Sequence, residues 1–179
     1  MFQNQCDTFQ LNDVRARGDA YSYYTPDWAA DGKVRIHFLN KMEKKQKDLI
    51  IDAYESVGLK VKRARRGKAD VFFISQGFDR EYEENYDYFN KFDELNDTVE
   101  IDRDLYGIGA KGPEGNTYEQ AAITQAVGKS LGLAMIPGSA NTFDTIMARP
   151  DRPYLAGGGY AGFTDYDKAN IACMLENLN

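Results

Sequence analysis

Histidine is nearly absent from this chain of 179 residues, which contains His37 and no other. A metal site built from three imidazoles is therefore excluded. A serine or cysteine nucleophile would need His37 as its base, and we interpret that residue as a surface histidine on a strand. The two cysteines, Cys6 and Cys173, lie at opposite ends of the chain without motif spacing. We expect two thiols rather than a disulfide.

Long apolar runs and an excess of positive charge are also lacking. No stretch approaches the roughly 18 apolar residues of a membrane span. Residues 1–13 lack the basic and apolar regions of a signal peptide, so we expect cytoplasmic synthesis without export. The formal net charge of -6 argues against nucleic acid or an anionic membrane surface as a partner.

The apolar content of 42% suits one globular domain that buries its own core. Residues 1–32 show no clear periodicity and are interpreted as an N-terminal arm, followed by a single domain over 33–179. Strict alternation over 33–39 predicts a half-buried strand with Val34, Ile36 and Phe38 inward. A helix should follow, capped by Asn40 with Glu43 and stopped by Gly58. Its expected core face is Met42, Leu49, Ile50, Ala53, Tyr54 and Val57.

Three further strands are predicted. Residues 59–65 alternate apolar and basic side chains, 69–75 form a near-continuous apolar run typical of a central strand, and 99–102 form a short strand. Between them, 78–98 is an insertion rich in tyrosine and acids. The order strand, helix, strand, strand predicts an α/β or α+β layer.

Two helices complete the pattern. Thr117 and Gln120 form a capping box for a helix over 118–131 that Gly132 closes. A loop over 136–163 follows, and Thr164 with Asp167 caps the last helix. The expected apolar face of that helix consists of Lys168 (through its stem), Ile171, Ala172 and Leu175.

This order of elements resembles the metzincin zinc proteases, and among them the matrixins, over about residues 33–178. Their motif H-E-x-x-H-x-x-G-x-x-H places its Gly at Gly132, and their Met-turn matches Thr145-Ile-Met-Ala-Arg-Pro150 with Met147 as its methionine. The resemblance implies an α+β fold of the zincin type. It would comprise a twisted mixed sheet, two long helices, a Met-turn loop and a C-terminal helix.

The chemistry of that motif is missing. Its three histidines fall on Gln125, Lys129 and Met135, and its catalytic glutamate falls on Ala126. An amide and a thioether are poor zinc ligands, an ammonium repels the ion, and alanine cannot activate water. Gln125, Ala126, Lys129, Met135 and Met147 are therefore interpreted as vestigial active-site positions, with no catalytic or metal-binding residue.

Two alternatives remain open at these positions. The Lys129 ammonium replaces the cation, with Gln125 and Asp144 as partners, or it extends into solvent from an ordinary helix. Calcium is the alternative cofactor, held by Asp97, Asp102 and Asp104, because matrixin-like domains bind calcium through loop oxygens. Otherwise no cofactor is expected.

The aromatic residues of the 78–98 insertion are candidate protein contacts: Tyr82, Tyr86, Tyr88, Phe89 and Phe92. Equally, half of them fold back into the core. The leading hypothesis is a pseudo-protease that acts as a structural or binding subunit of a larger oligomer or hetero-assembly, with a phage virion or tail component as one version. The alternatives are an enzyme with non-zinc chemistry in a cleft lined by Lys129, Asp144 and Tyr160, and a secreted peptide-binding decoy or inhibitor.

Overall fold

The computed structural model describes residues 26–77, 90–103, 118–133, 145–147 and 162–178. Its strands are β1 (Lys33–Phe38), β2 (Lys60–Arg63), β3 (Val71–Gln76), β4 (Asn90–Asp93) and β5 (Thr98–Asp102). Its α-helices are α2 (Lys44–Glu55), α3 (Tyr118–Ser130) and α4 (Asp165–Asn177), and two 3-10 turns are η2 (Asp27–Asp31) and η3 (Arg66–Lys68). No helix among these described residues is long and apolar enough to cross a membrane.

The five strands form one mixed sheet in the order β2-β1-β3-β5-β4. The pairs β1–β2, β1–β3 and β3–β5 are parallel, and β4 runs antiparallel to β5. The fold class is therefore α+β with a mixed sheet, as the sequence predicts at that coarse level. The expected strands over 33–39, 59–65, 69–75 and 99–102 are all present. Strand β4 was not expected, because it lies within the segment interpreted as an insertion.

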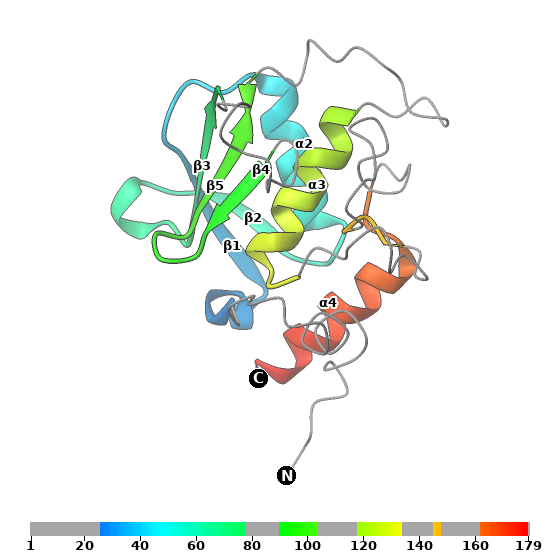
Figure 1. Ribbon diagram of the computed structural model, residues 1–179. Helices are drawn as coiled ribbons and strands as arrows, with labels where there is room; N and C mark the ends of the chain where they lie inside the picture. Colours follow the sequence, from blue (N-terminus) through cyan, green and yellow to red (C-terminus); the bar gives the residue numbers. More distant parts are fainter. Residues whose placement is uncertain (1–25, 78–89, 104–117, 134–144, 148–161, 179) are drawn as a thin grey trace.

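The core lies between one face of the sheet and the two helices α2 and α3 (Figure 1). The two helices run in the same direction. Lys45 forms an ion pair with Glu119 at their first turns, and Tyr54 contacts Ser130 at their last turns. Tyr54 is fully buried, and its hydroxyl lies 2.6 Å from the Ser130 hydroxyl. Its ring packs edge-on against Phe73 of β3, so one side chain joins both helices to the sheet.

The start of α2 differs from the expected cap. The helix begins at Lys44 after Glu43, which makes no side-chain capping bond. Asn40 instead donates its side-chain amide to the Ser75 carbonyl and accepts from the Ser75 N–H. The Asn40 side chain therefore joins the end of β1 to the end of β3, where the extended backbone of Ser75 lies within hydrogen-bonding distance. Of the predicted core face, Ile50, Ala53 and Tyr54 are buried in the helix, Met42 is buried just before it, and Leu49 and Val57 are half-buried.

Helix α4 has the predicted cap but a different buried face. Thr164 and Asp167 form the capping box, with each side chain bonded to the other residue's backbone N–H. Lys168 and Ala172, expected to face inward, are exposed, whereas Ile171 is buried and Leu175 half-buried. The buried stripe is rotated toward Asp167, Asn170 and Met174 because the cap itself points into the protein.

Cys173, on α4, is disulfide-bonded, so the expectation of a thiol there is wrong. The one other cysteine in the sequence, Cys6, lies outside the described residues. Spacing along the chain could not show this bond, because a disulfide depends on how close two Cα atoms lie in space.

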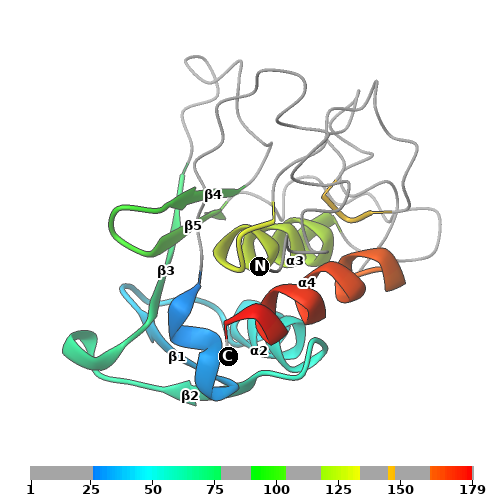
Figure 2. The ribbon, with the colours of Figure 1, turned by 90° about the horizontal axis from the view of Figure 1, so that it is seen from below.

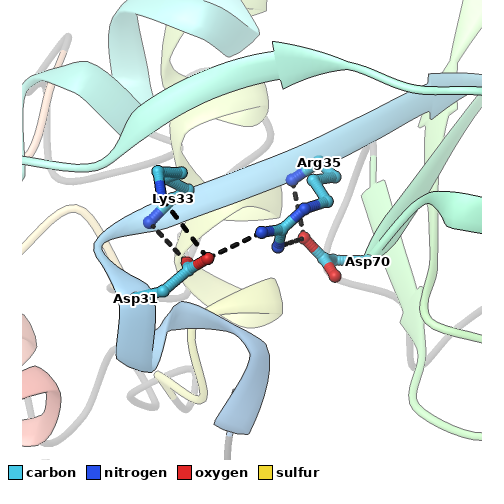
Figure 3. Close-up of polar contacts among 4 residues, drawn as sticks. All are labelled: Asp31, Lys33, Arg35 and Asp70. Atoms are coloured by element: carbon cyan, nitrogen blue, oxygen red, sulfur yellow. Dashed lines mark hydrogen bonds and ion pairs between the residues drawn. The ribbon is translucent and has the colours of Figure 1, made fainter.

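The sheet face opposite α2 and α3 carries a charged cluster (Figure 3). Arg35 contacts Asp31 at 2.6 Å and Asp70 at 3.1 Å, and Asp70 also accepts the Arg35 backbone N–H. The hydrogen bond from Arg35 holds the pKa of Asp31 below its ordinary value, while both aspartates raise the pKa of Arg35. His37 lies two residues on, with Nδ1 2.9 Å from the Ala64 carbonyl oxygen. Through Arg35, the cluster connects η2 and the residue before β3 to β1.

The first described residues before β1 belong to the packed structure. Ala29 in η2 is buried, and Trp28 packs edge-on against Tyr54 with ring centroids 6.4 Å apart. These residues fall within the segment interpreted from the sequence as an N-terminal arm, of which residues 1–25 lie outside the described residues.

Candidate functional site

Helix α3 positions the two polar side chains that the sequence singles out. Gln125 and Lys129 are four residues apart and therefore project from one face. The helix ends where predicted, since Gly132 has a φ of 86° that favours glycine and the Leu133 N–H donates to the Gly128 carbonyl. Gln125 is 3% exposed, so its amide lies inside the protein rather than in an open groove.

The Gln125 amide joins α3 to the 145–147 turn and to β4. Its Nε2 donates to the Ile146 carbonyl at 2.7 Å, and that carbonyl fixes which end of the amide is nitrogen. The Oε1 atom therefore faces Asn90, whose Nδ2 lies 3.5 Å away, a long hydrogen bond. Asn90 is 1% exposed, and its own Oδ1 has no hydrogen-bond partner.

Lys129 does not simply extend into solvent. Its Nζ donates to the backbone carbonyl of Asn90 at 3.2 Å, and the residue is half-buried. Gln125 and Lys129 thus both contact Asn90, the first residue of edge strand β4. Asp144, the carboxylate expected beside Lys129, lies outside the described residues.

Met147 lies directly beneath α3. It is fully buried, and a Cβ added to Gly128 would lie 2.7 Å from its sulfur, 3.3 Å from Phe163 and 3.4 Å from Leu133. Glycine is required at position 128 because the methionine approaches the helix backbone so closely. Ala126, the next small residue on α3, is also fully buried and belongs to the core.

A buried carboxylate fastens the same turn to α4. Asp167 is fully buried and accepts hydrogen bonds from the Thr145 hydroxyl and the Ile146 N–H, the latter at 2.9 Å. It also accepts from the Thr164 N–H at 3.0 Å and the Thr164 hydroxyl at 2.9 Å. Four donors and the positive end of the helix dipole compensate its burial. The 145–147 turn is therefore held between α3 and α4 by polar contacts on both sides.

The chemistry of the Gln125 and Lys129 side chains does not fit a zinc ion. Zinc needs lone pairs from imidazole, thiolate or carboxylate groups. Here both side chains present N–H donors to backbone carbonyls. In the part of the chain that the structure describes, no group of three or more His, Cys, Asp or Glu side chains is arranged to hold a metal.

Several sequence-predicted residues are not brought together or lie outside the described part. Asp97 and Asp102 flank opposite ends of β5, roughly 15 Å apart at strand spacing, so they cannot share one calcium ion. Asp104, Met135, Tyr160, Tyr82, Tyr86, Tyr88 and Phe89 lie outside the described residues. Phe92 lies on β4 and packs, half-buried, against the core.

Two residues of the site, Asn90 and Gly128, were not identified from the sequence, and Asp167 was expected only as a capping residue. Asn90 lies in a segment that resembles a polar insertion, and its partners are 35 and 39 residues away. Gly128 has a signal that could have been used, since a glycine inside a helix without kink or cap indicates a close approach.

The sequence matches none of the protein-family models, and none of the curated proteins, with which it was compared.

Replacing Gly128 with alanine should destabilise the protein by about 1–3 kcal/mol, because the new methyl group overlaps the Met147 sulfur. Urea unfolding measures the loss. Gly162→Ala is the matched control, since nothing lies within 4 Å of its added Cβ. Adding Met147→Ala to Gly128→Ala should cost less than the two separate changes combined. Additive losses would show that Met147 does not contact the helix in this way.

Replacing Asp167 with asparagine should cost roughly 3 kcal/mol of unfolding free energy, because a buried acceptor of four hydrogen bonds loses its charge and part of its acceptor capacity. Asp165→Asn is the control: it changes an exposed carboxylate in the same first turn and should cost less than 1 kcal/mol. Equal losses for the two variants would contradict a special role for Asp167.

Proposed function

We propose that this protein is a metzincin-like domain without zinc protease chemistry, which acts as a structural or binding subunit of a larger protein assembly. The observation that carries the proposal is how the side chains of Gln125 and Lys129 are hydrogen-bonded. Both occupy positions of zinc-binding histidines in the motif that the sequence resembles, and both are hydrogen-bonded to backbone carbonyls instead. The side chains that would bind metal serve to join three parts of the fold.

Three features of the fold support the metzincin-like part of the proposal. A mixed sheet packs against two helices, as the resemblance implies. The second helix ends at a glycine in the left-handed conformation. A buried methionine in a turn packs beneath that helix, at the place where the motif has its Met-turn.

Two features support a role in an assembly. Among the described residues, the outer strand β2 has one edge without a neighbouring strand, and such edges are templates for pairing with another chain. The disulfide at Cys173 suits a protein used in an oxidising environment, such as the surface of a virion. Purification of the assembled form from its source should therefore give this chain in a complex rather than as a hydrolytic monomer.

Restoring the ligands tests the metzincin-like geometry. The triple variant Gln125→His, Lys129→His and Met135→His should bind one zinc ion per chain with submicromolar affinity, measured by isothermal titration calorimetry, because its three imidazoles would meet the ion.

The matched control is Gln125→His with Met135→His, in which Lys129 remains. Two imidazoles beside an ammonium should bind zinc at least about 100-fold more weakly. If the folded triple variant bound zinc no better than this control, the three positions would not converge and the metzincin-like proposal would fail.

A further inference from the structure

Six basic residues lie within nine positions, from Lys60 in β2 to Lys68 in η3, and this segment contains no acidic residue. All six are exposed: Lys60, Lys62, Arg63, Arg65, Arg66 and Lys68. They are six of the 22 basic residues of the chain, which leaves 16 to set against 28 acidic ones elsewhere. The protein is acidic overall, but this edge of the sheet, here named the basic edge, is strongly cationic.

The basic edge is not neutralised by the rest of the described structure. None of its six side chains forms an ion pair with a described residue, whereas Arg35 is held by two aspartates and Lys45 contacts Glu119. Arg63 packs against an aromatic ring instead: its guanidinium lies 4.4 Å from the centre of the Phe38 ring. Six like charges side by side repel one another, which an anionic partner would relieve.

The backbone of the same strand is open on its outer side. The Lys60 N–H donates to Gly32 and the Ala64 N–H donates to Ile36, so these alternate residues face β1. The backbone N–H and C=O groups of Val61 and Arg63 therefore point away from the sheet. No described strand lies on that side, and Figure 2 shows β2 outside β1 at the rim.

Cations flank this open backbone on both faces of the sheet. Lys60 pairs in register with Lys33 and Lys62 with Arg35, so both lysines lie on the face away from the helices. Arg63 pairs with Ile36 and lies on the face that α2 covers. The outward main-chain donors and acceptors thus run between two lysines on one face and Arg63 on the other.

We infer that the basic edge binds an acidic, extended segment of a protein partner, which adds as a strand beside β2. A peptide strand supplies N–H donors for the outward carbonyls, C=O acceptors for the outward N–H groups, and side chains on both faces. Acidic side chains opposite these lysines and arginines form favourable cross-strand pairs. A basic strand is repelled by the same charges, and a neutral strand would desolvate them without compensation, which protects the edge from indiscriminate pairing.

A nucleic-acid strand fits this edge less well. Its phosphates accept hydrogen bonds but donate none, so the phosphate backbone cannot pair with the outward carbonyls of Val61 and Arg63. The phosphates of one strand would also contact cations along a single line, whereas these cations lie on two opposite faces of the sheet. The inference concerns a surface remote in the fold from Gln125 and Lys129, and goes beyond the proposed function.

Fluorescence anisotropy with a labelled octapeptide, rich in glutamate on both strand faces, tests the inference. The full chain should bind this peptide at low salt and release it as salt increases. Lys62→Glu should weaken binding about fivefold to tenfold, because a cross-strand attraction becomes a repulsion. Lys168→Glu, the same change on exposed α4, should leave the affinity within about twofold. Absence of peptide binding, or equal loss in both variants, would overturn the inference.

Strand addition is separated from simple charge attraction by two further measurements. The same peptide, N-methylated at alternate backbone nitrogens, keeps its charge but loses donors, and should bind at least about tenfold more weakly. Arg63→Pro removes an outward N–H and should weaken binding beyond Arg63→Ala, with thermal unfolding confirming that both variants fold. Equal binding of the methylated peptide, or stronger binding of an oligothymidine of equal charge, would overturn strand addition. Neither outcome bears on the zinc titration of the proposed function.

Discussion

The close approach of the 145–147 turn to α3 is the constraint on which the rest of the site depends. Gly128 permits it, because any side chain there would overlap Met147. Asp167 holds the turn from the opposite side, through the Thr145 hydroxyl and the Ile146 N–H. Once the turn is in place, the Ile146 carbonyl fixes the Gln125 amide, which in turn orients Asn90. A helix, a turn and an edge strand are thereby joined by a chain of buried polar contacts.

These contacts explain why polar side chains at Gln125 and Lys129 are tolerated inside the protein. A buried amide must be hydrogen-bonded, since leaving it unpaired costs roughly 1–3 kcal/mol. Gln125 meets that demand with a backbone carbonyl, and Lys129 places its ammonium on the carbonyl of Asn90 rather than in apolar surroundings. We interpret both as structural residues at positions where the resembled family binds metal. The exposed cationic cluster from Lys60 to Lys68 lies elsewhere in the fold.

Local patterns predicted the elements but not their long-range partners. Alternation identified β1, the apolar run identified β3, and the capping box of Thr164 and Asp167 was correct. Asn40 was wrongly expected to cap α2 because its preferred partner, Ser75, is 35 residues away. Strand β4 was missed because it has only four residues and its sequence, Asn90-Lys-Phe-Asp93, resembles the polar segment before it. The disulfide at Cys173 had no local signature either.

The direct test of the central claim is the zinc content of the unmodified protein, purified with its disulfide intact, equilibrated with excess zinc and then passed through a desalting column. The account predicts less than about one tenth of a zinc ion per chain by mass spectrometry, because Lys129 presents an ammonium and the Gln125 amide is a poor zinc ligand already hydrogen-bonded to Ile146 and Asn90. One zinc ion per chain, lost in a Gln125→Ala variant that still folds, would contradict it.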